Sequence, residues 1–396
     1  MNGQLQLNLD ITHDFASEIE KESAFVSPYL AELTVDPSER IVRFRATDPA
    51  RLNEVEKKVA TFLHSMLAGY REAEPRVVFQ TVRNQSRPIE KDVFGKLQEQ
   101  GWLHEVGPGH VSLAGPPLRF IAHLDSVIQK IYEEQFAAIE RSFPALVPAR
   151  ILAKAGYFDS HPNNVTMTTH LVNDFDLIEK FRQNEGRSGD MSSLSAGSFA
   201  TPHLCLNPAA CLPCYPVYAN QDVSEGCALS WKGRVFRYES SNIRGLERLT
   251  EFNVRELVLI GDSEYVATGH EKAIAIVKSL CEMLEIEGVL VTATDPFFAT
   301  VSATKKFWQQ SMEAKYEIRL PFEQAANGKL SYVAAGSINH HGTFFGSRFV
   351  INSGSEEFAN TGCVGLGLER WLLACFAQHG TLPDKWPEAV RHAVFQ

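Results

Sequence analysis

The sequence predicts an α+β protein in which an antiparallel β-sheet is flanked by helices and preceded by a smaller α+β module. Apolar runs of strand length follow one another from residue 199 onward, at 203–207, 226–238, 253–260, 288–293, 315–322, 331–337 and 348–352. Most of these runs are joined by short loops, which favours antiparallel pairing. Amphipathic patterns with helical spacing cover 118–143, 265–286 and 365–378. Helices are therefore available to cover the sheet.

Residues 1–115 are expected to form the N-terminal module, and residues 116–396 the catalytic domain. The segments 29–35 and 41–45 alternate in polarity around a turn at 36–38, which predicts a hairpin. Apolar residues at helical spacing predict a helix over 51–73. A short helix follows near 90–100. Nothing in this module indicates catalysis.

Two segments lie between the module and the strand-rich region. The helix over 118–143 is expected to stop at Phe143, because Pro144 follows it. Residues 186–198 are rich in Gly and Ser, which predicts a lid or a disordered linker.

Composition narrows the class of protein. The chain of 396 residues has room for two domains, with 44% hydrophobic and 22% charged residues. Its net charge of -10 argues against a broad basic surface that binds nucleic acid. No apolar run is long enough to span a membrane. The N-terminus lacks signal-peptide features, so a cytoplasmic location is expected. The seven cysteines are then core residues, metal ligands or catalytic thiols rather than disulfides.

One hairpin, residues 236–256, concentrates groups that suit a nucleotide. It carries two arginines, an aromatic ring and two carboxylates, namely Arg237, Glu239, Arg248, Phe252 and Glu256. Guanidinium groups bind phosphate, a ring stacks on a base, and a carboxylate holds an amine or a metal. A surface hairpin joined by ion pairs is the alternative.

A second candidate lies near the C-terminus. Gly362, Gly365 and Gly367 lead into a helix that carries Arg370 in its first turns. Glycines allow the backbone to approach a ligand closely, and an arginine at that point can meet a polyphosphate. Tight packing of the helix is the alternative explanation for the glycines.

Three stretches in this order resemble the motifs of class II aminoacyl-tRNA synthetases. FPALVPARILAKAGY resembles motif 1, FRYE followed by Arg248 and Phe252 resembles motif 2, and GLGLER resembles motif 3. The resemblance implies an antiparallel sheet of six or seven strands, ATP bound in a bent conformation with Mg²⁺, and a homodimer formed through motif 1.

The resemblance also implies roles for the motif residues. Arg237 would hold the α-phosphate, Glu239 and Arg248 would serve the ATP side, and Phe252 would stack on adenine. Arg370 would meet the γ-phosphate. Arg237, Glu239 and Arg370 are thus the expected catalytic residues.

Cysteines at motif positions extend the resemblance to two smaller groups. These are the zinc-dependent seryl-tRNA synthetases of methanogens and the amino acid:[carrier protein] ligases. Cys211, Glu256 and Cys363 are the zinc ligands that the resemblance implies, leaving one tetrahedral position for an α-amino group. Cys214 is a rival for the first ligand, because Cys211 and Cys214 are only three residues apart.

The stretches PAACLPCYPVY, FNVRELVLIG, SINHHGTFFGSRF and NTGCVGLGLERW are more similar to the ligases, from about residue 105 to the end. The expected function is therefore activation of a small amino acid to an aminoacyl adenylate and its transfer to the phosphopantetheine thiol of a carrier protein. tRNA and membranes are not expected partners. A zinc-dependent seryl-tRNA synthetase and a non-catalytic synthetase paralogue with a binding or regulatory role are the alternatives.

The segment GSINHHGTFFG carries further polar residues. In related enzymes this strand end holds ATP and Mg²⁺, so Asn339 is expected to contact ATP. His340 and His341 are interpreted as hydrogen-bonded residues at the end of the strand. Lys315 and Glu317 share one strand face, where they line the substrate pocket or form an ion pair.

Overall fold

The computed structural model describes residues 2–68, 75–83, 87–192, 194–293, 315–354 and 357–395. Its centre is an eight-stranded sheet with the order β4-β13-β14-β15-β16-β12-β11-β7. All neighbours pair antiparallel except β7, which runs parallel to β11. The predicted antiparallel sheet is confirmed, but it has eight strands rather than the six or seven expected, and the predicted strand over 203–207 lies in a separate three-stranded sheet. The strands are β4 Val77–Thr81, β7 Ile139–Glu140, β11 Cys227–Phe236, β12 Glu251–Gly261, β13 Gly288–Thr292, β14 Lys315–Gln324, β15 Leu330–Gly342 and β16 Asn360–Gly367.

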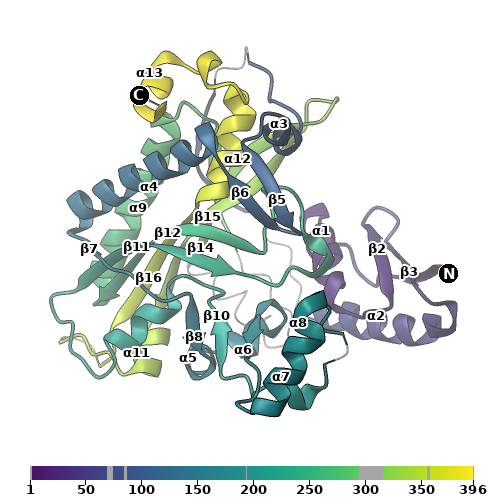
Figure 1. The fold of residues 1–396 in the computed structure, drawn as a ribbon. Coiled ribbons are helices and arrows are strands. Elements are labelled where there is room, and N and C mark those ends of the chain that lie inside the picture. Colours follow the sequence, from purple (N-terminus) through teal and green to yellow (C-terminus); the bar gives the residue numbers. More distant parts are fainter. Residues whose placement is uncertain are drawn as a thin grey trace.

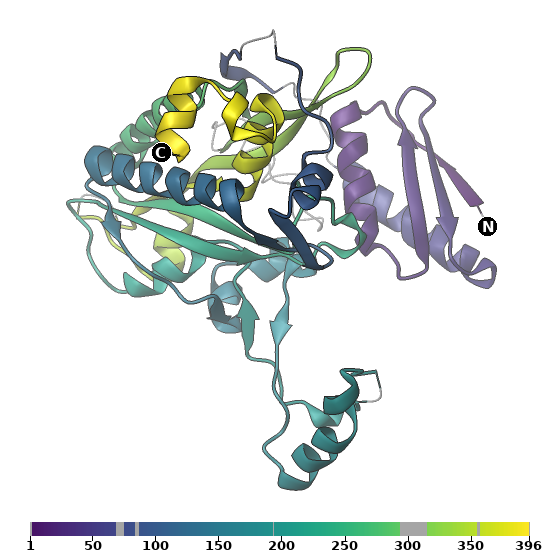
Figure 2. The same ribbon diagram turned by 45° about the horizontal axis from the view of Figure 1, so that its top comes forward.

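Helices cover one face of this sheet (Figures 1 and 2). They are α4 Gly115–Phe136, α9 Ser263–Met283, α12 Leu368–His379 and α13 Glu388–Phe395. Leu257 and Leu259 of β12 join the core beneath these helices, whereas Val258 and Ile260 join a separate core on the other face. Side chains alternate along a strand, so Glu256 also points to the other face. The short elements η5 Leu212–Val217 and α11 Phe344–Phe349 pack on that face.

One predicted strand is wrong, and three strands of the central sheet were missed. The segment 348–352 is the end of α11, where Val350 takes a left-handed φ of 57°, and not a strand. The missed strands are β4, β7 and β16, of which β16 lies between β15 and β12. Glycine is rare in strands, so residue propensities do not predict β16. The glycines are nevertheless needed, because neighbouring atoms lie close to them. A Cβ at Gly362 would lie 3.0 Å from Val266 Cγ1 and 3.2 Å from the carbonyl oxygen of Asn339. The glycine positions of β16 therefore have no room for a larger side chain without movement of their neighbours.

Helix α4 ends earlier than its sequence pattern predicts. Ala137 adopts a left-handed φ of 50°, and the chain then extends as β7 beside β11. Arg255 explains the change, because this side chain is only 2% exposed and needs counter-charges. Its Nε donates to Asp125 of α4 at 2.8 Å, and its Nη1 donates to Glu140 of β7 at 2.9 Å. The buried guanidinium therefore holds α4 and β7 together.

The N-terminal residues form a small unit with a core of its own. Its elements are β1 Asn2–Gln6, α1 His13–Glu22, β2 Leu30–Asp36, β3 Ile41–Ala46 and α2 Leu52–Leu67. The predicted hairpin is β2–β3, and the predicted helix over 51–73 is α2, whose continuation over 69–73 lies outside the described residues.

Residues 77–113 pack with the large unit rather than with this one. β4 pairs with β13 of the central sheet. Leu97 of α3 Val93–Glu99 and Leu103 of β5 Leu103–Gly107, which pairs with β6 His110–Leu113, belong to the large core. We therefore infer a boundary between α2 and β4, in place of the one expected at residue 115. The N-terminal unit is then residues 2–67.

An arm projects from the large unit between β9 Met167–Thr168 and β10 Leu204–Leu206 (Figure 2). β10 pairs with β9 and with β8 Leu146–Pro148 at its base. The arm carries α7 Phe175–Gln183, α8 Glu185–Ser188 and a 3-10 turn at Ala196–Ser198. The prediction of a disordered linker over 186–198 is therefore wrong for the residues that lie in α8 and in the 3-10 turn. Residue 193 lies outside the described residues.

Candidate active site

Strand register aligns a row of side chains on the face opposite the α4 and α9 helices. Glu256 of β12 pairs with Trp231 of β11 on one side and with Gly365 of β16 on the other. Gly365 in turn pairs with Ser337 of β15, and Ser337 pairs with Glu317 of β14. Directly paired residues point to the same face. The row therefore spans five adjacent strands.

Gly365 makes room for the carboxylate of Glu256. A Cβ at position 365 would lie 2.9 Å from Glu256 Oε2, which is closer than real contacts allow. A glycine at this point lets the carboxylate lie over the strand beside it.

Three potential metal ligands converge next to this row. Cys211, Glu256 and Cys363 each offer one ligand atom, and these atoms all lie within 4.8 Å of one another. Cys211 comes directly before η5, and Cys363 is two positions from Gly365 on β16. Cys214 is fully buried but does not belong to this group. The structure thus brings together the three residues expected from the sequence, with Cys211 rather than Cys214.

Burial makes the group unfavourable for negative charge. Burial first, and then Cys363, raise the pKa of Glu256 well above its usual value. The hydrogen bond with Cys211, followed by burial, raises the pKa of Cys363. Three acidic groups packed together out of water need protons or a cation to neutralise them. Two thiols and a carboxylate are ligand types that bind zinc, so the donor set fits that metal.

Residues of β15 surround the Cys363 thiol. Asn339 Nδ2 donates to Cys363 Sγ at 3.4 Å and to Ser337 Oγ at 3.0 Å. His341 Nε2 lies 3.6 Å from the same sulfur, and its Nδ1 lies 3.1 Å from Thr361 Oγ1. Asn339 therefore lies at the thiol group, and its expected contact with ATP stays a prediction. His341 was not predicted as a site residue, although its position two residues from Asn339 places it on the same strand face.

His340 lies on the other face of the sheet. Its ring packs edge-on against His270 of α9, with centroids 5.6 Å apart. Burial lowers the pKa of both histidines. His340 and His341, which are adjacent in the sequence, thus lie on opposite faces of the sheet, because neighbours in a strand point in opposite directions.

The expected nucleotide residues gather at the open end of the β11–β12 hairpin. Strand β11 ends at Phe236, so Arg237 and Glu239 lie in the loop after it and not in the strand. Arg237 Nε donates to the carbonyl of Pro208 at 3.1 Å, and its guanidinium lies 5.6 Å from the ring centroid of Phe252. Arg248 Nη1 lies 2.9 Å from Glu239 Oε2. These contacts hold the two arginines in place before any ligand binds.

Arg370 joins this set from the first turn of α12. Its Nη1 donates to the carbonyl of Ala334 at 2.6 Å and its Nε to that of Glu247 at 2.8 Å. Burial, and then Arg237 and Arg248, lower the pKa of Arg370 to about 10. Arg370 and Phe252 line one small pocket with Leu246, Leu249, Gly367 and Glu369. The cluster has the excess of positive charge that a polyphosphate neutralises.

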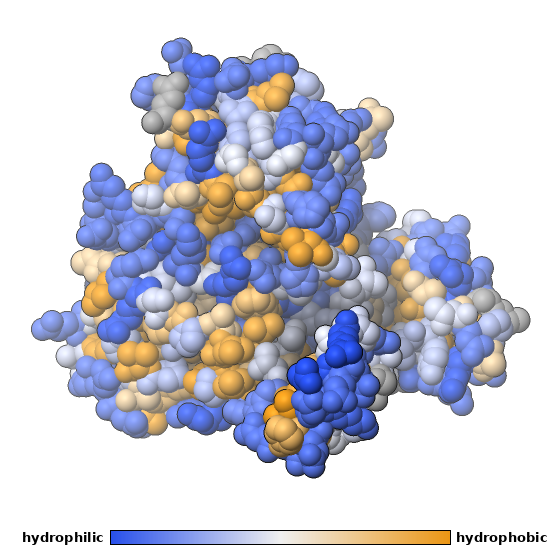
Figure 3. All heavy atoms as spheres, in the orientation of Figure 1, coloured by the Kyte–Doolittle hydropathy of each residue, from blue (hydrophilic) through white to orange (hydrophobic). Residues whose placement is uncertain are grey.

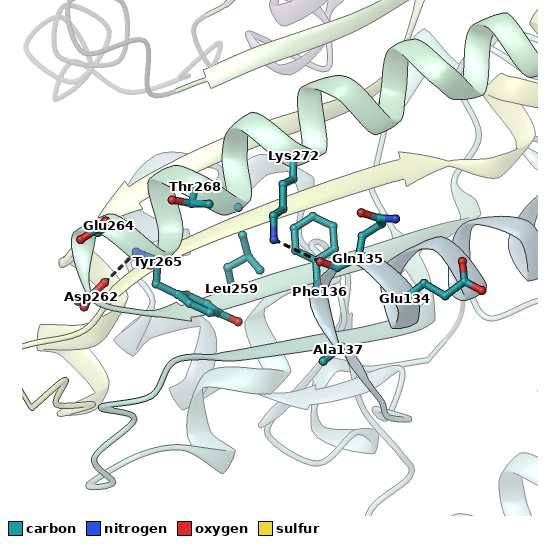
Figure 4. Close-up of a pocket in the computed structure, with 11 residues that line it drawn as sticks. Glu134, Gln135, Phe136, Ala137, Leu259, Asp262, Glu264, Tyr265, Thr268 and Lys272 are labelled. Atoms are coloured by element: carbon teal, nitrogen blue, oxygen red, sulfur yellow. Dashed lines mark hydrogen bonds between the residues drawn. The ribbon is translucent and has the colours of Figure 1, made fainter.

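A larger cavity of about 520 Å³ lies away from these residues, between the end of α4 and the start of α9 (Figure 4). Tyr265, Phe136 and Lys272 line it, and the Lys272 ammonium donates to the carbonyl of Gln135 at 3.4 Å. None of the expected site residues is among the described residues that line it. We therefore assign it no part in the chemistry.

Known proteins share both the motifs and the fold of this chain. A family model described as tRNA synthetase class II core domain (G, H, P, S and T) matches residues 200–379. Two amino acid--[acyl-carrier-protein] ligases of Bradyrhizobium diazoefficiens, numbers 1 and 2, are each 30% identical. Their matches cover 63% and 73% of this chain and 74% and 84% of the relatives. The chain belongs to the class II synthetase family. Motif 2 is then the β11–β12 hairpin, and motif 3 is β16 with the start of α12.

Seryl-tRNA ligases are also similar to this chain. The type-2 serine--tRNA ligase of Methanopyrus kandleri is 26% identical over 79% of this chain and 63% of its own. The chain thus spans less than two thirds of that relative. A crystal structure of M. kandleri SerRS in complex with A. aeolicus tRNASec has a TM-score of 0.68, with 24% identity, over 99% of this chain and 77% of the other. A Naegleria fowleri serine-tRNA ligase in complex with AMP has a TM-score of 0.61 at 12% identity.

The described part of this class II synthetase contains no helix with the length and apolar character needed to cross a bilayer. All seven cysteines are free thiols, as the sequence predicts.

Proposed function

We propose that this chain is an ATP-dependent ligase that joins a small amino acid to the phosphopantetheine thiol of a carrier protein. The observation that carries the proposal is the convergence of Cys211, Glu256 and Cys363, with Arg237 of the arginine cluster close enough to attract the Glu256 carboxylate. One site is suited to an amino group and the other to a polyphosphate. An enzyme that activates an amino acid with ATP needs both next to each other.

Cys211, Glu256 and Cys363 would hold zinc. When bound, zinc supplies a Lewis-acidic position for the α-amino group of the substrate. Asn339 and His341 support the Cys363 thiol from the side, and Gly365 leaves space for the Glu256 carboxylate. Trp231 lies beside Glu256 in the same row, and both side chains are buried.

The first step forms an aminoacyl adenylate. Class II synthetases use ATP and Mg²⁺, and the amino acid carboxylate attacks the α-phosphorus while pyrophosphate leaves. Arg237 would orient the α-phosphate, and Phe252 would stack on adenine. Arg370 borders the same pocket as Phe252, and bent ATP would return its γ-phosphate to that place. The arginines stabilise charge on the phosphates, so no protein nucleophile is needed.

The second step transfers the aminoacyl group. The phosphopantetheine thiol attacks the carbonyl carbon, AMP leaves, and a thioester forms. The ligases of B. diazoefficiens support a carrier protein as acceptor, because they are 30% identical to this chain and the M. kandleri enzyme is 26% identical. The N-terminal unit has more Asp and Glu than Lys and Arg, which disfavours a nucleic acid surface there.

We also propose a homodimer through motif 1. Ile139 of β7 and Leu146 of β8 flank the start of this motif and are 51% and 43% exposed. Hydrophobic residues gather on this side of the surface (Figure 3). A second copy of the chain would cover them.

ATP–pyrophosphate exchange with a panel of amino acids tests the activation step. We expect a small amino acid to support exchange, and the mass of a phosphopantetheinylated carrier protein to rise by one aminoacyl group. Charging of tRNA without any change in the carrier would favour a zinc-dependent seryl-tRNA synthetase instead. No exchange with any amino acid would favour the non-catalytic paralogue, which the presence of Arg237, Glu239 and Arg370 opposes.

A further inference from the structure

His341 of β15 connects a buried hydroxyl group with the Cys363 thiol. Its Nε2 lies 3.6 Å from Cys363 Sγ, and its Nδ1 lies 3.1 Å from Thr361 Oγ1. Cys363 and Thr361 both belong to β16, the strand that pairs with β15. Thr361 is fully buried, and Cys363 is only 6% exposed. The imidazole ring is therefore held between two buried groups of the neighbouring strand.

A β-bulge gives His341 this position. His340 pairs with Gly362, and Gly342 pairs with Thr361, so His341 is an extra residue without a register partner on β16. Gly342 has a left-handed φ of 56°, which glycine adopts without strain. Bulges of this kind redirect a side chain and are common next to active sites. The extra residue allows one imidazole ring to contact Thr361 and Cys363 together.

Aromatic packing fixes the orientation of the imidazole ring. The ring of Phe345 meets it edge-on, with centroids 4.9 Å apart. Phe345 in turn stacks on the fully buried Tyr215, with centroids 4.3 Å apart. A ring that is held at its side and at Nδ1 has little freedom to turn. Contacts within the protein therefore keep Nε2 beside the sulfur.

The groups that face the two ring nitrogens decide which nitrogen carries the proton. A cysteine binds a metal as a thiolate, which accepts hydrogen bonds and donates none. Nε2 must then carry the proton, and Nδ1 accepts the hydrogen of the Thr361 hydroxyl group. Among the described residues, the group whose ligand atoms lie within 4.8 Å of one another does not include His341. The geometry thus favours a donor to the sulfur over a fourth ligand.

We propose that His341 is a positioning residue of the metal site, whose Nε2–H donates a hydrogen bond to the thiolate of Cys363. This inference rests on the proposed zinc site. A hydrogen bond to a sulfur ligand fixes its position and withdraws charge from it, and loss of such a partner typically weakens metal binding by about 10- to 100-fold. A thiolate that gives less charge to the metal leaves it a stronger acceptor for an α-amino group. The contact therefore favours binding of the substrate amine.

Cobalt(II) in place of zinc tests the contact in the full chain, because the charge-transfer absorption of a cobalt–thiolate bond reports the charge on the sulfur. His341→Phe keeps a flat ring against Phe345 but has no donor. Its charge-transfer band should move to longer wavelength, and its zinc affinity, measured by competition with a chelator, should fall about 10- to 100-fold. His341→Gln retains an N–H group and should keep most of both properties. Thr361→Val removes only the hydroxyl group and should shift the band in the same direction as His341→Phe.

His340→Gln is the matched control, because His340 is adjacent in the strand but packs against His270 on the other face of the sheet. Its band and its zinc affinity should equal those of the unmodified chain. A band that stays in place in His341→Phe would overturn the inference. Equal loss of zinc in His341→Phe and His341→Gln would overturn it as well, because the donor would then not be the cause. An unmodified chain that binds neither zinc nor cobalt would instead overturn the proposed metal site, and this inference with it.

Discussion

Glu256 and Gly365 pair across β12 and β16, and the carboxylate of the first occupies the space where the second lacks a side chain. This relationship connects motif 2 with motif 3. It also places a carboxylate next to two thiols that are remote in the sequence. The proposed metal site and the packing of the two central strands therefore depend on each other.

Gly365→Ala tests this connection. The added methyl would lie 2.9 Å from Glu256 Oε2, so the carboxylate must move and the metal site must distort. We expect zinc content and pyrophosphate exchange to fall at least about tenfold, as when a metal site loses its supporting contacts. Gly367→Ala is the control for metal content, because a Cβ there meets its nearest neighbours at 3.5 Å or more. Full zinc in Gly365→Ala would contradict the prediction.

Metal analysis of three cysteine variants tests the ligand set. Cys211→Ala and Cys363→Ala each remove one thiol from the group whose ligand atoms lie within 4.8 Å of one another. We expect about one zinc ion per chain in the unmodified protein, and each variant should lose most of it. Cys214→Ala should retain its zinc, because that buried thiol lies outside the group. Zinc measured per folded chain separates ligand loss from unfolding. If Cys214→Ala loses zinc and Cys211→Ala keeps it, the first zinc ligand is Cys214 and not Cys211.

Arg237→Ala should lower amino-acid-dependent pyrophosphate exchange by about a hundredfold or more. The reason is that a fixed guanidinium at the α-phosphate stabilises charge mainly in the transition state. Arg234→Ala serves as the control, because Arg234 forms an ion pair with Glu251 at the exposed side of the same hairpin. Near-normal exchange in Arg237→Ala would refute the assignment of this arginine.

His270 predicts a pH dependence of stability. This side chain is buried, its Nε2 has no hydrogen-bond partner among the described residues, and burial lowers its pKa from 6.5 to about 4. His270 therefore becomes protonated near pH 6.5 in the unfolded chain, but only near pH 4 in the folded chain. The free energy of unfolding should fall as pH falls through this window, by up to about 1.4 kcal/mol per pH unit.

Chemical denaturation of His270→Leu between pH 7 and pH 4 measures this contribution. The pH dependence should become shallower in this variant, and the remaining slope includes His340, whose pKa burial also lowers. His104→Leu changes an exposed histidine and should leave the slope unchanged. An equal slope in all three proteins would exclude His270 as the cause.

The sequence alone determined the fold class and named the candidate site residues. Periodicity is a local property, so the helices and most of the strands could be predicted from their own residues. The motif 2 and motif 3 arginines could be found because their spacing within one hairpin or one helix start is short. The thiols and Glu256 came only from their positions in the motifs, since their separation in the chain is large.

Only the tertiary structure decided how distant segments meet. Tertiary packing placed Cys211 rather than Cys214 next to Glu256 and Cys363, and close packing explained the glycines of β16. Alternation along β15 put His340 and His341 on opposite faces of the sheet. The hydrogen bonds from Asn242 and Ser240 to backbone carbonyls of the N-terminal unit also join segments that are remote in the sequence. The local sequence determines which face of a strand or helix a side chain occupies. Which residue it meets on that face depends on the free energy of the whole packed chain.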